Sequence, residues 1–288
     1  MGSIGARMRT YAGFVRISHT IFALPFALVG AVLASRVQPL TWTRVAWIVA
    51  AMVTARSAAM GFNRLVDARH DALNPRTAMR EIPRGAMSRT EATLFVGVSS
   101  LLFIACAYQL GPVTFALSPV ALAIVFWYSL AKRVTHYTQL FLGLAMAVAP
   151  VGGWLAAGGP FMAPEPWLLA LAIGTWVGGF DILYACLDLA FDREQGLHSI
   201  PVRFGVRGAL LISRAMHVVT IACLAAIGAI ASLGAIYMAG VAGVALLLVW
   251  EQSLVREHDL SQVKRAFDMN GYVGILYMAT TMIAIYVG

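Results

Sequence analysis

The sequence contains few charged residues for its length. Only 12% of the 288 residues are Asp, Glu, Lys or Arg, whereas 60% are hydrophobic. A soluble globular domain usually has about 25% charged residues, so this composition argues against an ordinary soluble protein. A bilayer core about 30 Å thick needs roughly 20 apolar residues per spanning helix, and the chain has material for about eight or nine such helices. We therefore expect an integral membrane protein with short loops.

Cysteine is scarce as well. Cys106, Cys186 and Cys223 lie in separate apolar stretches and form no CxxC pair, which argues against a disulfide framework and a thiolate metal site. The N-terminal region also lacks the features of a cleavable signal peptide, because its apolar stretch is too long and has no small-residue cleavage site. We expect this first hydrophobic segment to remain as a helix.

Apolar runs bounded by glycine, proline and charged residues predict nine helices. Their ranges are 14–34, 43–69, 90–109, 112–131, 136–156, 165–191, 206–229, 233–254 and 269–287. These runs are too long and too continuous for the alternating strands of a membrane barrel, and helices satisfy their own backbone groups in lipid. The predicted fold class is therefore all-α, a single domain over residues 1–288 built as a bundle of about nine transmembrane helices.

Basic residues outnumber acidic ones, 21 against 13, which gives a formal charge of +8. They flank apolar spans, so we expect contact with the lipid bilayer and no nucleic-acid partner. The loops after the second, fourth, sixth and eighth predicted helices hold nearly all of the Arg and Lys and lie on the same side as the N-terminus. By the positive-inside rule this side is cytoplasmic, and we expect the protein in the inner (cytoplasmic) membrane.

The few acidic residues gather in two clusters at predicted helix ends on the cytoplasmic side. The first cluster ends the second predicted helix, where Asn63, Asp67 and Asp71 follow one another at intervals of four residues. This spacing places their oxygens on one helix face, and Arg56 shares that face deeper in the membrane. Acids at a membrane are costly, so their placement is informative about function.

The second cluster ends the sixth predicted helix. Asp181, Tyr184, Asp188 and Asp192 are spaced by three or four residues, which predicts that they also share one helix face. Stacked carboxylates repel one another, and the negative end of the helix dipole increases this repulsion. A hard divalent cation such as Mg²⁺ offsets it, and Mg²⁺ typically binds one or two carboxylates together with substrate phosphates. Two facing acid pairs with arginines between them therefore predict a metal-bridged diphosphate site that opens to the cytoplasm.

Simple juxtamembrane charge is the alternative explanation, in which the acids pair with Arg64, Arg69 and Arg193. Two matched acid pairs on one membrane face are costly, and this cost favours a functional site.

Three sequence motifs follow one another in a fixed order. The first is NxxxDxxxD with Asn-Pro-Arg-Thr after it, over residues 63–77; the second is Tyr-Ser-Leu-Ala-Lys-Arg-Val-Thr at 128–135; the third is DxxxD at 188–192. In spacing, order and helix count they resemble the UbiA family of membrane-bound aromatic prenyltransferases over essentially the whole chain. Arg64 departs from the family pattern, since many members have Asp at this position.

The resemblance implies a transferase that moves a polyprenyl group from a polyprenyl diphosphate to a ring carbon of a small aromatic acid. The segments 18–25 and 196–201 are similar to the branch of the family that prenylates quinone precursors. The acceptor is then 4-hydroxybenzoate or a dihydroxynaphthoate, in ubiquinone or menaquinone biosynthesis. The implied cofactor is Mg²⁺, and its implied ligands, which are also catalytic residues, are Asp67, Asp71, Asp188 and Asp192, with Asn63 as a neutral ligand.

Basic residues are candidates for direct contact with the diphosphate, because guanidinium groups bind phosphate oxygens in pairs. We assign this role to Arg56, Lys132 and Arg133, with Arg133 also catalytic; stop-transfer charge is the alternative explanation. Arg76, Arg80 and Arg84 are candidates for a lid over the site, with Arg76 and Arg80 binding substrate, although topogenic charge is the commoner reason for a basic loop.

Three further residues have candidate roles at the reacting carbon or the acceptor. Tyr184 shares the face of Asp188, where its ring could stabilise an allylic cation, although most helical tyrosines only pack. Asp181 lies deeper and could orient the acceptor hydroxyl or take its proton, and a buried ion pair with Arg56 is the alternative. His19 could meet the acceptor carboxylate, but a lone histidine is more often structural.

A membrane transporter is the alternative from another functional class, since paired acids and arginines also mark ion and substrate pathways. Transporter sites usually lie near the bilayer midplane, between inverted repeats and broken helices. Here the acids gather at helix ends on one side, which favours an enzyme. The acceptor, the prenyl chain length and the oligomeric state stay open.

Overall fold

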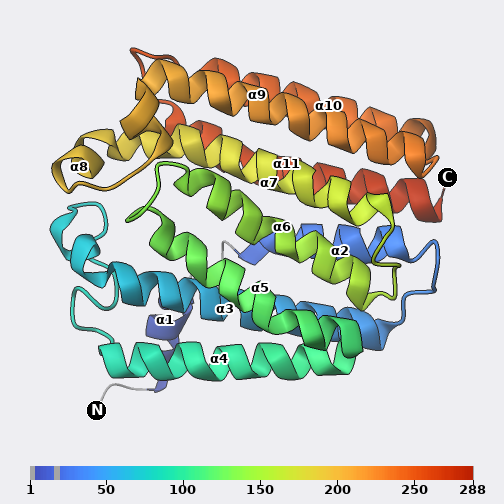
Figure 1. Cartoon of the computed structure of the whole chain (residues 1–288), viewed down its shortest axis with the longest axis horizontal. Helices are drawn as coiled ribbons and strands as arrows, with labels where there is room; N and C mark the ends of the chain where they lie inside the picture. The colour runs from blue at the N-terminus through green and yellow to red at the C-terminus, as the bar shows by residue number, and fades with distance from the viewer. Residues whose placement is uncertain (1–3, 16–19, 288) are drawn as a thin grey trace.

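The computed structural model describes residues 4–15 and 20–287, and in these ranges the long regular elements are all helices. This confirms the predicted all-α class (Figure 1). The helices are α1 (Ile4–Val15), α2 (Thr20–Ala34), α3 (Trp42–Leu73), α4 (Arg89–Leu110), α5 (Pro112–Ala131), α6 (Thr138–Ala156), α7 (Pro164–Ala185), α8 (Leu189–Glu194), α9 (Ile200–Ile230), α10 (Gly234–Leu254) and α11 (Val263–Tyr286).

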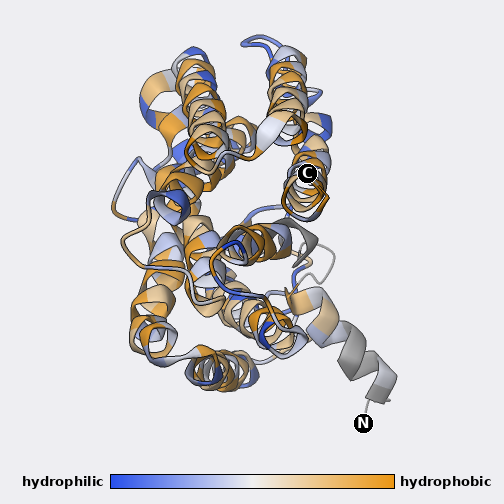
Figure 2. Ribbon diagram, turned by 90° about the vertical axis from the view of Figure 1, so that its right-hand side faces the viewer, coloured by the Kyte–Doolittle hydropathy of each residue, from blue (hydrophilic) through white to orange (hydrophobic). Residues whose placement is uncertain are grey.

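The protein is a multi-pass membrane protein. In the part of the chain that the structure describes, seven helices are long and apolar enough to cross a membrane: α3, α4, α5, α6, α7 continued to Glu194, α9 and α10. The nine predicted helices correspond to α2–α7 and α9–α11. Two of them are not among the seven candidate spans: α2, which has only a shorter apolar stretch, Leu24–Ala34, and α11. Large hydrophobic side chains such as Leu101 and Leu246 are exposed, as lipid contact requires. Hydrophobic residues are found along all the long helices of the bundle (Figure 2).

The long helices run along a common direction in two groups (Figure 1). The most extensive helix contacts are α7 with α9, α6 with α7, α3 with α4, α2 with α6, and α10 with α11, and α2 also packs against α11. Because the helices alternate in direction, the C-terminal end of α3, the loop after α5 and the segment after α7 meet at one end of the bundle (Figure 1). Both predicted acidic clusters lie at this end.

The helices α2, α6 and α7 approach one another through glycines. An added Cβ at Gly153 would lie 1.9 Å from the carbonyl oxygen of Ala27, and one at Gly143 would lie 2.2 Å from that of Gly174. Glycine is required at such positions because any side chain would overlap the neighbouring backbone. These contacts fix one face of α6 against α2 and α7.

Two helix ends differ from the predicted ones. The helix α3 continues to Leu73, so Asp71 lies inside it rather than beyond its end. The second acidic cluster was expected on one continuous helix, but α7 ends at Ala185 and a 3₁₀ turn, Cys186–Asp188, precedes α8. A 3₁₀ turn has three residues per turn instead of 3.6, which rotates Asp188 relative to the face that carries Asp181.

Candidate active site

A polar pocket of about 170 Å³ lies at the end of the bundle where α3, α5 and α8 meet. It brings together residues from three distant parts of the sequence, which are Asn63, Asp67, His70, Asp71, Asn74, Arg76, Thr77, Arg80, Lys132, Asp188, Phe191, Asp192 and Leu197. All five proposed metal ligands are among them.

Asp67 is buried at the wall of this pocket, with 3% of its surface exposed. Its carboxylate accepts hydrogen bonds from Lys132 Nζ at 2.7 Å and from Arg133 Nη2 at 3.2 Å. Asn63 Nδ2 donates to the same carboxylate at 3.3 Å. The other contact of Arg133 is with the carbonyl oxygen of Val66, at 2.6 Å. Two basic side chains therefore compensate a buried charge that would otherwise be costly.

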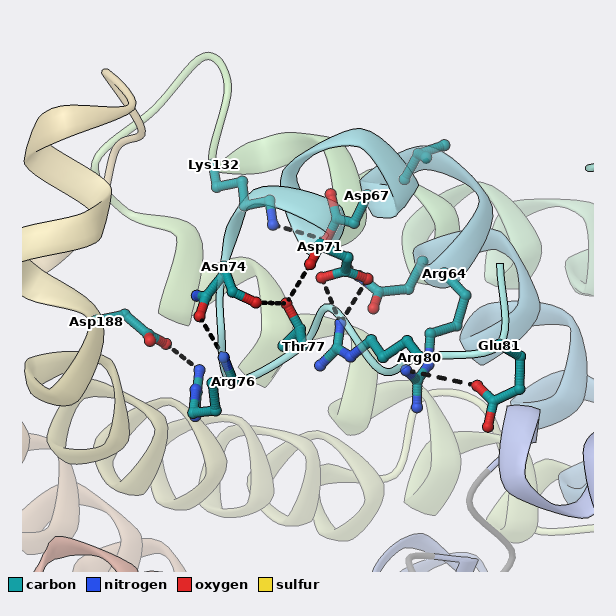
Figure 3. A network of polar contacts seen from close by, with 12 residues as sticks. Arg64, Asp67, Asp71, Asn74, Arg76, Thr77, Arg80, Glu81, Lys132 and Asp188 are labelled. Carbon is teal, nitrogen blue, oxygen red and sulfur yellow. Dashed lines mark hydrogen bonds and ion pairs between the residues drawn. The ribbon is translucent and has the colours of Figure 1, made fainter. Parts of the chain in front are cut away.

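Asp71 has a separate basic partner, one turn further along α3. Arg80 Nη1 donates to both carboxylate oxygens of Asp71, each at 2.8 Å (Figure 3). The Thr77 hydroxyl donates to the Asp71 carbonyl oxygen at 3.1 Å. Thr77 and Arg80 lie in the loop between α3 and α4, so these bonds fold that loop back over the end of its own helix.

Arg76, from the same loop, extends across the pocket to the C-terminal end of α7 and the 3₁₀ turn that follows it. Its Nη2 donates to the Asp188 carboxylate (Figure 3). Its Nη1 donates to the Tyr184 hydroxyl at 2.8 Å. The guanidinium carbon also lies 5.1 Å from the centre of the Tyr184 ring, within the range of a cation–π contact. Asn74 Oδ1 accepts from the Arg76 backbone N–H at 2.9 Å, which sets the turn that directs this arginine inward.

The loop between α5 and α6 carries Lys132 to the pocket. The α5 helix ends at Ala131, so the lysine begins the loop. The Lys132 carbonyl oxygen accepts from the His198 backbone N–H at 2.8 Å, and the Thr138 hydroxyl donates to the His198 carbonyl oxygen at 3.1 Å. These bonds join the loop before α6 to the loop before α9 and hold the basic segment in place.

The remaining predicted residues lie elsewhere. Asp181 and Tyr184 line neither this pocket nor the larger cavity described below, and Tyr184 reaches the site only through Arg76. Arg56 lines the larger cavity. His19 lies outside the described residues. Arg64 does not line the pocket, and its Nη1 lies 3.9 Å from Glu81 instead.

Sequence reasoning did not assign a site role to five pocket residues: His70, Asn74, Thr77, Phe191 and Leu197. His70 lies three residues after Asp67, so helical spacing could have found it. Asn74 precedes Pro75, a dipeptide that favours a turn, and Thr77 follows within that turn. Phe191 carries no signal that separates it from other apolar residues of the membrane segments.

The pocket suits a divalent cation that is shared with a phosphate. Its side chains supply carboxylate and amide oxygens, the hard ligands that Mg²⁺ takes, and Mg²⁺ commonly uses only one or two carboxylates plus phosphate oxygens. Within residues 4–15 and 20–287, no group of three or more His, Cys, Asp or Glu side chains is placed to hold a metal ion by itself. The donor set therefore fits a cation that arrives with an anionic ligand.

A second, apolar cavity of about 700 Å³ is lined by residues of α2 to α7 and α9. It begins next to the polar pocket: Arg56 lies about two turns before Asn63 on α3, and Tyr128 about one turn before Lys132 on α5. Leu144 and Leu171 line the cavity and are about half exposed, at 49% and 50%. The cavity therefore reaches the lipid-facing surface.

The chain matches the profile of the UbiA prenyltransferase family over residues 23–276. It is 32% identical over 251 residues to a 4-hydroxybenzoate octaprenyltransferase of Vibrio parahaemolyticus, covering 85% of this chain and 86% of the relative. It is also 32% identical over 235 residues to the 4-hydroxybenzoate octaprenyltransferase of Sodalis glossinidius, covering 80% of this chain and 79% of that relative.

Solved structures agree with this match. The apo structure of a UbiA homolog from Aeropyrum pernix K1 superposes with a TM-score of 0.85 at 38% identity, covering 93% of this chain and 98% of that one. A UbiA homolog from Archaeoglobus fulgidus, bound to GPP and Mg²⁺, has a TM-score of 0.74 at 20% identity, covering 96% of this chain and 99% of that one. At this lower identity the second likeness concerns the fold alone.

Proposed function

Because the chain belongs to the UbiA prenyltransferase family, we propose that it transfers a polyprenyl group from polyprenyl diphosphate to a ring carbon of 4-hydroxybenzoate, in ubiquinone biosynthesis. The observation that carries this proposal is that two cavities of different polarity follow one another along α3 and α5. A polar pocket of about 170 Å³ with acidic and basic side chains adjoins an apolar cavity of about 700 Å³. A polyprenyl diphosphate has the same division, a charged head group and a long apolar tail.

The head group is bound by the basic side chains that surround the carboxylates. Lys132 and Arg133 contact Asp67, Arg80 contacts Asp71, and all of these cations line or border the pocket. Each can donate further hydrogen bonds to phosphate oxygens, because a lysine has three N–H donors and an arginine has five. A divalent cation, which we propose is Mg²⁺, would neutralise charge on the diphosphate when bound there and so make it a better leaving group.

In the reaction the bond between the allylic carbon and the diphosphate oxygen breaks, and the electron pair leaves with the oxygen. The acceptor ring carbon then forms a bond to the allylic carbon, and its proton is lost to a base or to water. The basic side chains, already held in place by their carboxylate partners, stabilise the negative charge that develops on the departing diphosphate. The apolar lining next to Arg56 and Tyr128 limits the access of water to the allylic cation.

We propose 4-hydroxybenzoate rather than a dihydroxynaphthoate, and hence ubiquinone rather than menaquinone, because the curated relatives quoted above carry that name. A transporter function is not favoured, since the acids lie at one end of the bundle beside a basic loop. We further propose that residues 1–288 form one domain, that the protein resides in the inner membrane, and that the polar pocket faces the cytoplasm.

The direct test uses purified protein in detergent with geranyl or octaprenyl diphosphate, Mg²⁺ and a panel of acceptors. We expect a prenylated product and released diphosphate with 4-hydroxybenzoate, lower turnover with dihydroxynaphthoates, and none after chelation of the metal until Mg²⁺ is restored. Absence of product with every acceptor would refute the proposed function.

A further inference from the structure

One glycine in the wall of the apolar cavity has open space where a side chain would lie. Gly152 lines this cavity on α6, and a Cβ added there meets no heavy atom within 4 Å. The next residue, Gly153, also lines the cavity, but its Cβ would lie 1.9 Å from the Ala27 carbonyl oxygen. Gly153 thus faces α2, whereas the missing side chain of Gly152 leaves cavity volume unfilled.

The position of Gly152 along the cavity is far from the polar pocket. The α6 helix begins at Thr138, which is joined through His198 to the Lys132 loop. Gly152 lies fourteen residues further along this helix, at about 21 Å for a rise of about 1.5 Å per residue. A geranyl chain anchored by its diphosphate beside Asp67 and Lys132 is much shorter than this distance, whereas an octaprenyl chain is several times longer than a geranyl chain.

Because α6 is packed closely against its neighbours, the helix cannot shift to make room for a new side chain at residue 152. Gly153 and Gly143 hold its backbone against α2 and α7, at separations that leave no room for a shift. A side chain at residue 152 therefore projects into the cavity, since the face behind it is already closed.

We propose that Gly152 is a specificity-determining residue for long prenyl chains: the absence of a side chain keeps the distal cavity open for a tail that extends past α6. This inference rests on the proposed function, because it takes the apolar cavity as the site of the prenyl tail.

The test is a graded series, Gly152→Ala, Gly152→Leu and Gly152→Phe, with kcat/KM measured for geranyl and octaprenyl diphosphate under the same conditions. Gly97 is the matched control, because it is an exposed helical glycine of α4 that lines neither cavity and has no heavy atom within 4 Å of an added Cβ. For Gly152→Phe we expect the octaprenyl-to-geranyl ratio of kcat/KM to fall at least about tenfold, because the new ring would occupy cavity volume that only the longer tail needs. Gly152→Leu should give a smaller fall, and Gly97→Phe should leave the ratio as it is in the wild type.

The outcomes separate this inference from the proposed function. If the wild-type protein makes no prenylated product with either diphosphate, the proposed function fails and this inference with it. If the wild type is active but the ratio stays constant in Gly152→Leu and Gly152→Phe proteins of unchanged melting temperature, only this inference is overturned. An equal fall in Gly97→Phe would also overturn it, because the effect would then come from a bulky residue anywhere on the bundle.

Discussion

At the scale of single residues, the site consists of carboxylates that already have basic partners within the chain. Asp67 contacts Lys132 and Arg133, Asp71 contacts Arg80, and Asp188 contacts Arg76. These pairs balance charge at the membrane edge without a ligand. They also hold four cations where the diphosphate is proposed to bind, so the site is organised before the substrate arrives.

We predict that Asp67→Asn and Asp188→Asn each lower kcat at least about a hundredfold, because loss of one carboxylate disturbs both the cation site and the adjacent basic groups. The measurement is steady-state turnover of octaprenyl diphosphate with 4-hydroxybenzoate, together with the melting temperature in detergent. Asp268→Asn, on the exposed surface of α11, is the matched control and should retain wild-type turnover. Substantial activity in both site variants would contradict the ligand assignment.

We predict that Arg76→Lys lowers kcat/KM about tenfold although the charge is kept, because an ammonium group cannot reach Tyr184 and Asp188 with two nitrogens as the guanidinium does. Arg84→Lys, at an exposed position of the same loop, should have little effect. Kinetics of both variants over a range of diphosphate concentrations test this. Equal kinetics for Arg76→Lys and the wild type would show that charge alone matters at residue 76.

At the scale of elements, α6 packs through glycines on α2 and α7 and also forms part of the wall of the apolar cavity. A side chain has open space at Gly152 but overlaps the neighbouring backbone at Gly153. The same substitution at these adjacent residues should therefore have different effects on stability.

We predict that Gly153→Ala lowers the melting temperature by several degrees, since its methyl group would overlap the Ala27 backbone and force α2 and α6 apart. Gly152→Ala should leave the melting temperature unchanged or slightly higher, because alanine favours the helix and meets open space. Thermal unfolding of the two proteins in one detergent makes the comparison. Equal melting temperatures would mean that the α2–α6 contact is looser than the structure indicates.

At the scale of the whole molecule, the α3–α4 loop, which lines the polar pocket, and the loop between α6 and α7 lie at opposite ends of the bundle (Figure 1). The α3–α4 loop with Arg84 belongs to the pocket end, and Met162 is 86% exposed at the other end. The three native cysteines are buried, so introduced cysteines can report the orientation.

We predict that a membrane-impermeant thiol reagent labels Met162→Cys in intact cells but labels Arg84→Cys only after the membrane is opened. The reason is the concentration of Arg and Lys in the loops at the pocket end, which favours a cytoplasmic position. The opposite labelling pattern would place the pocket on the outer side and contradict the proposed orientation.

The membrane class, the helical fold and the composition of the acidic clusters follow from the amino-acid sequence alone. These depend on local quantities: the length of apolar runs, the cost of charge in lipid, and the helical spacing that brings Asn63, Asp67 and Asp71 to one face. The prediction from helical spacing was wrong at Asp188, where one continuous helix was expected. A 3₁₀ turn that interrupts the helix leaves no clear mark in the residue pattern.

The pairing of the charged side chains, in contrast, depends on how the helices pack. Arg76 contacts Asp188 across 112 positions of sequence and Lys132 contacts Asp67 across 65, and no local pattern specifies such partners. Arg64 likewise lies near Glu81 rather than in the pocket. The apolar cavity and the open space at Gly152 exist only because helices separated in sequence pack with glycines on one side and a gap on the other, and the sizes of such gaps depend on the whole arrangement of the bundle.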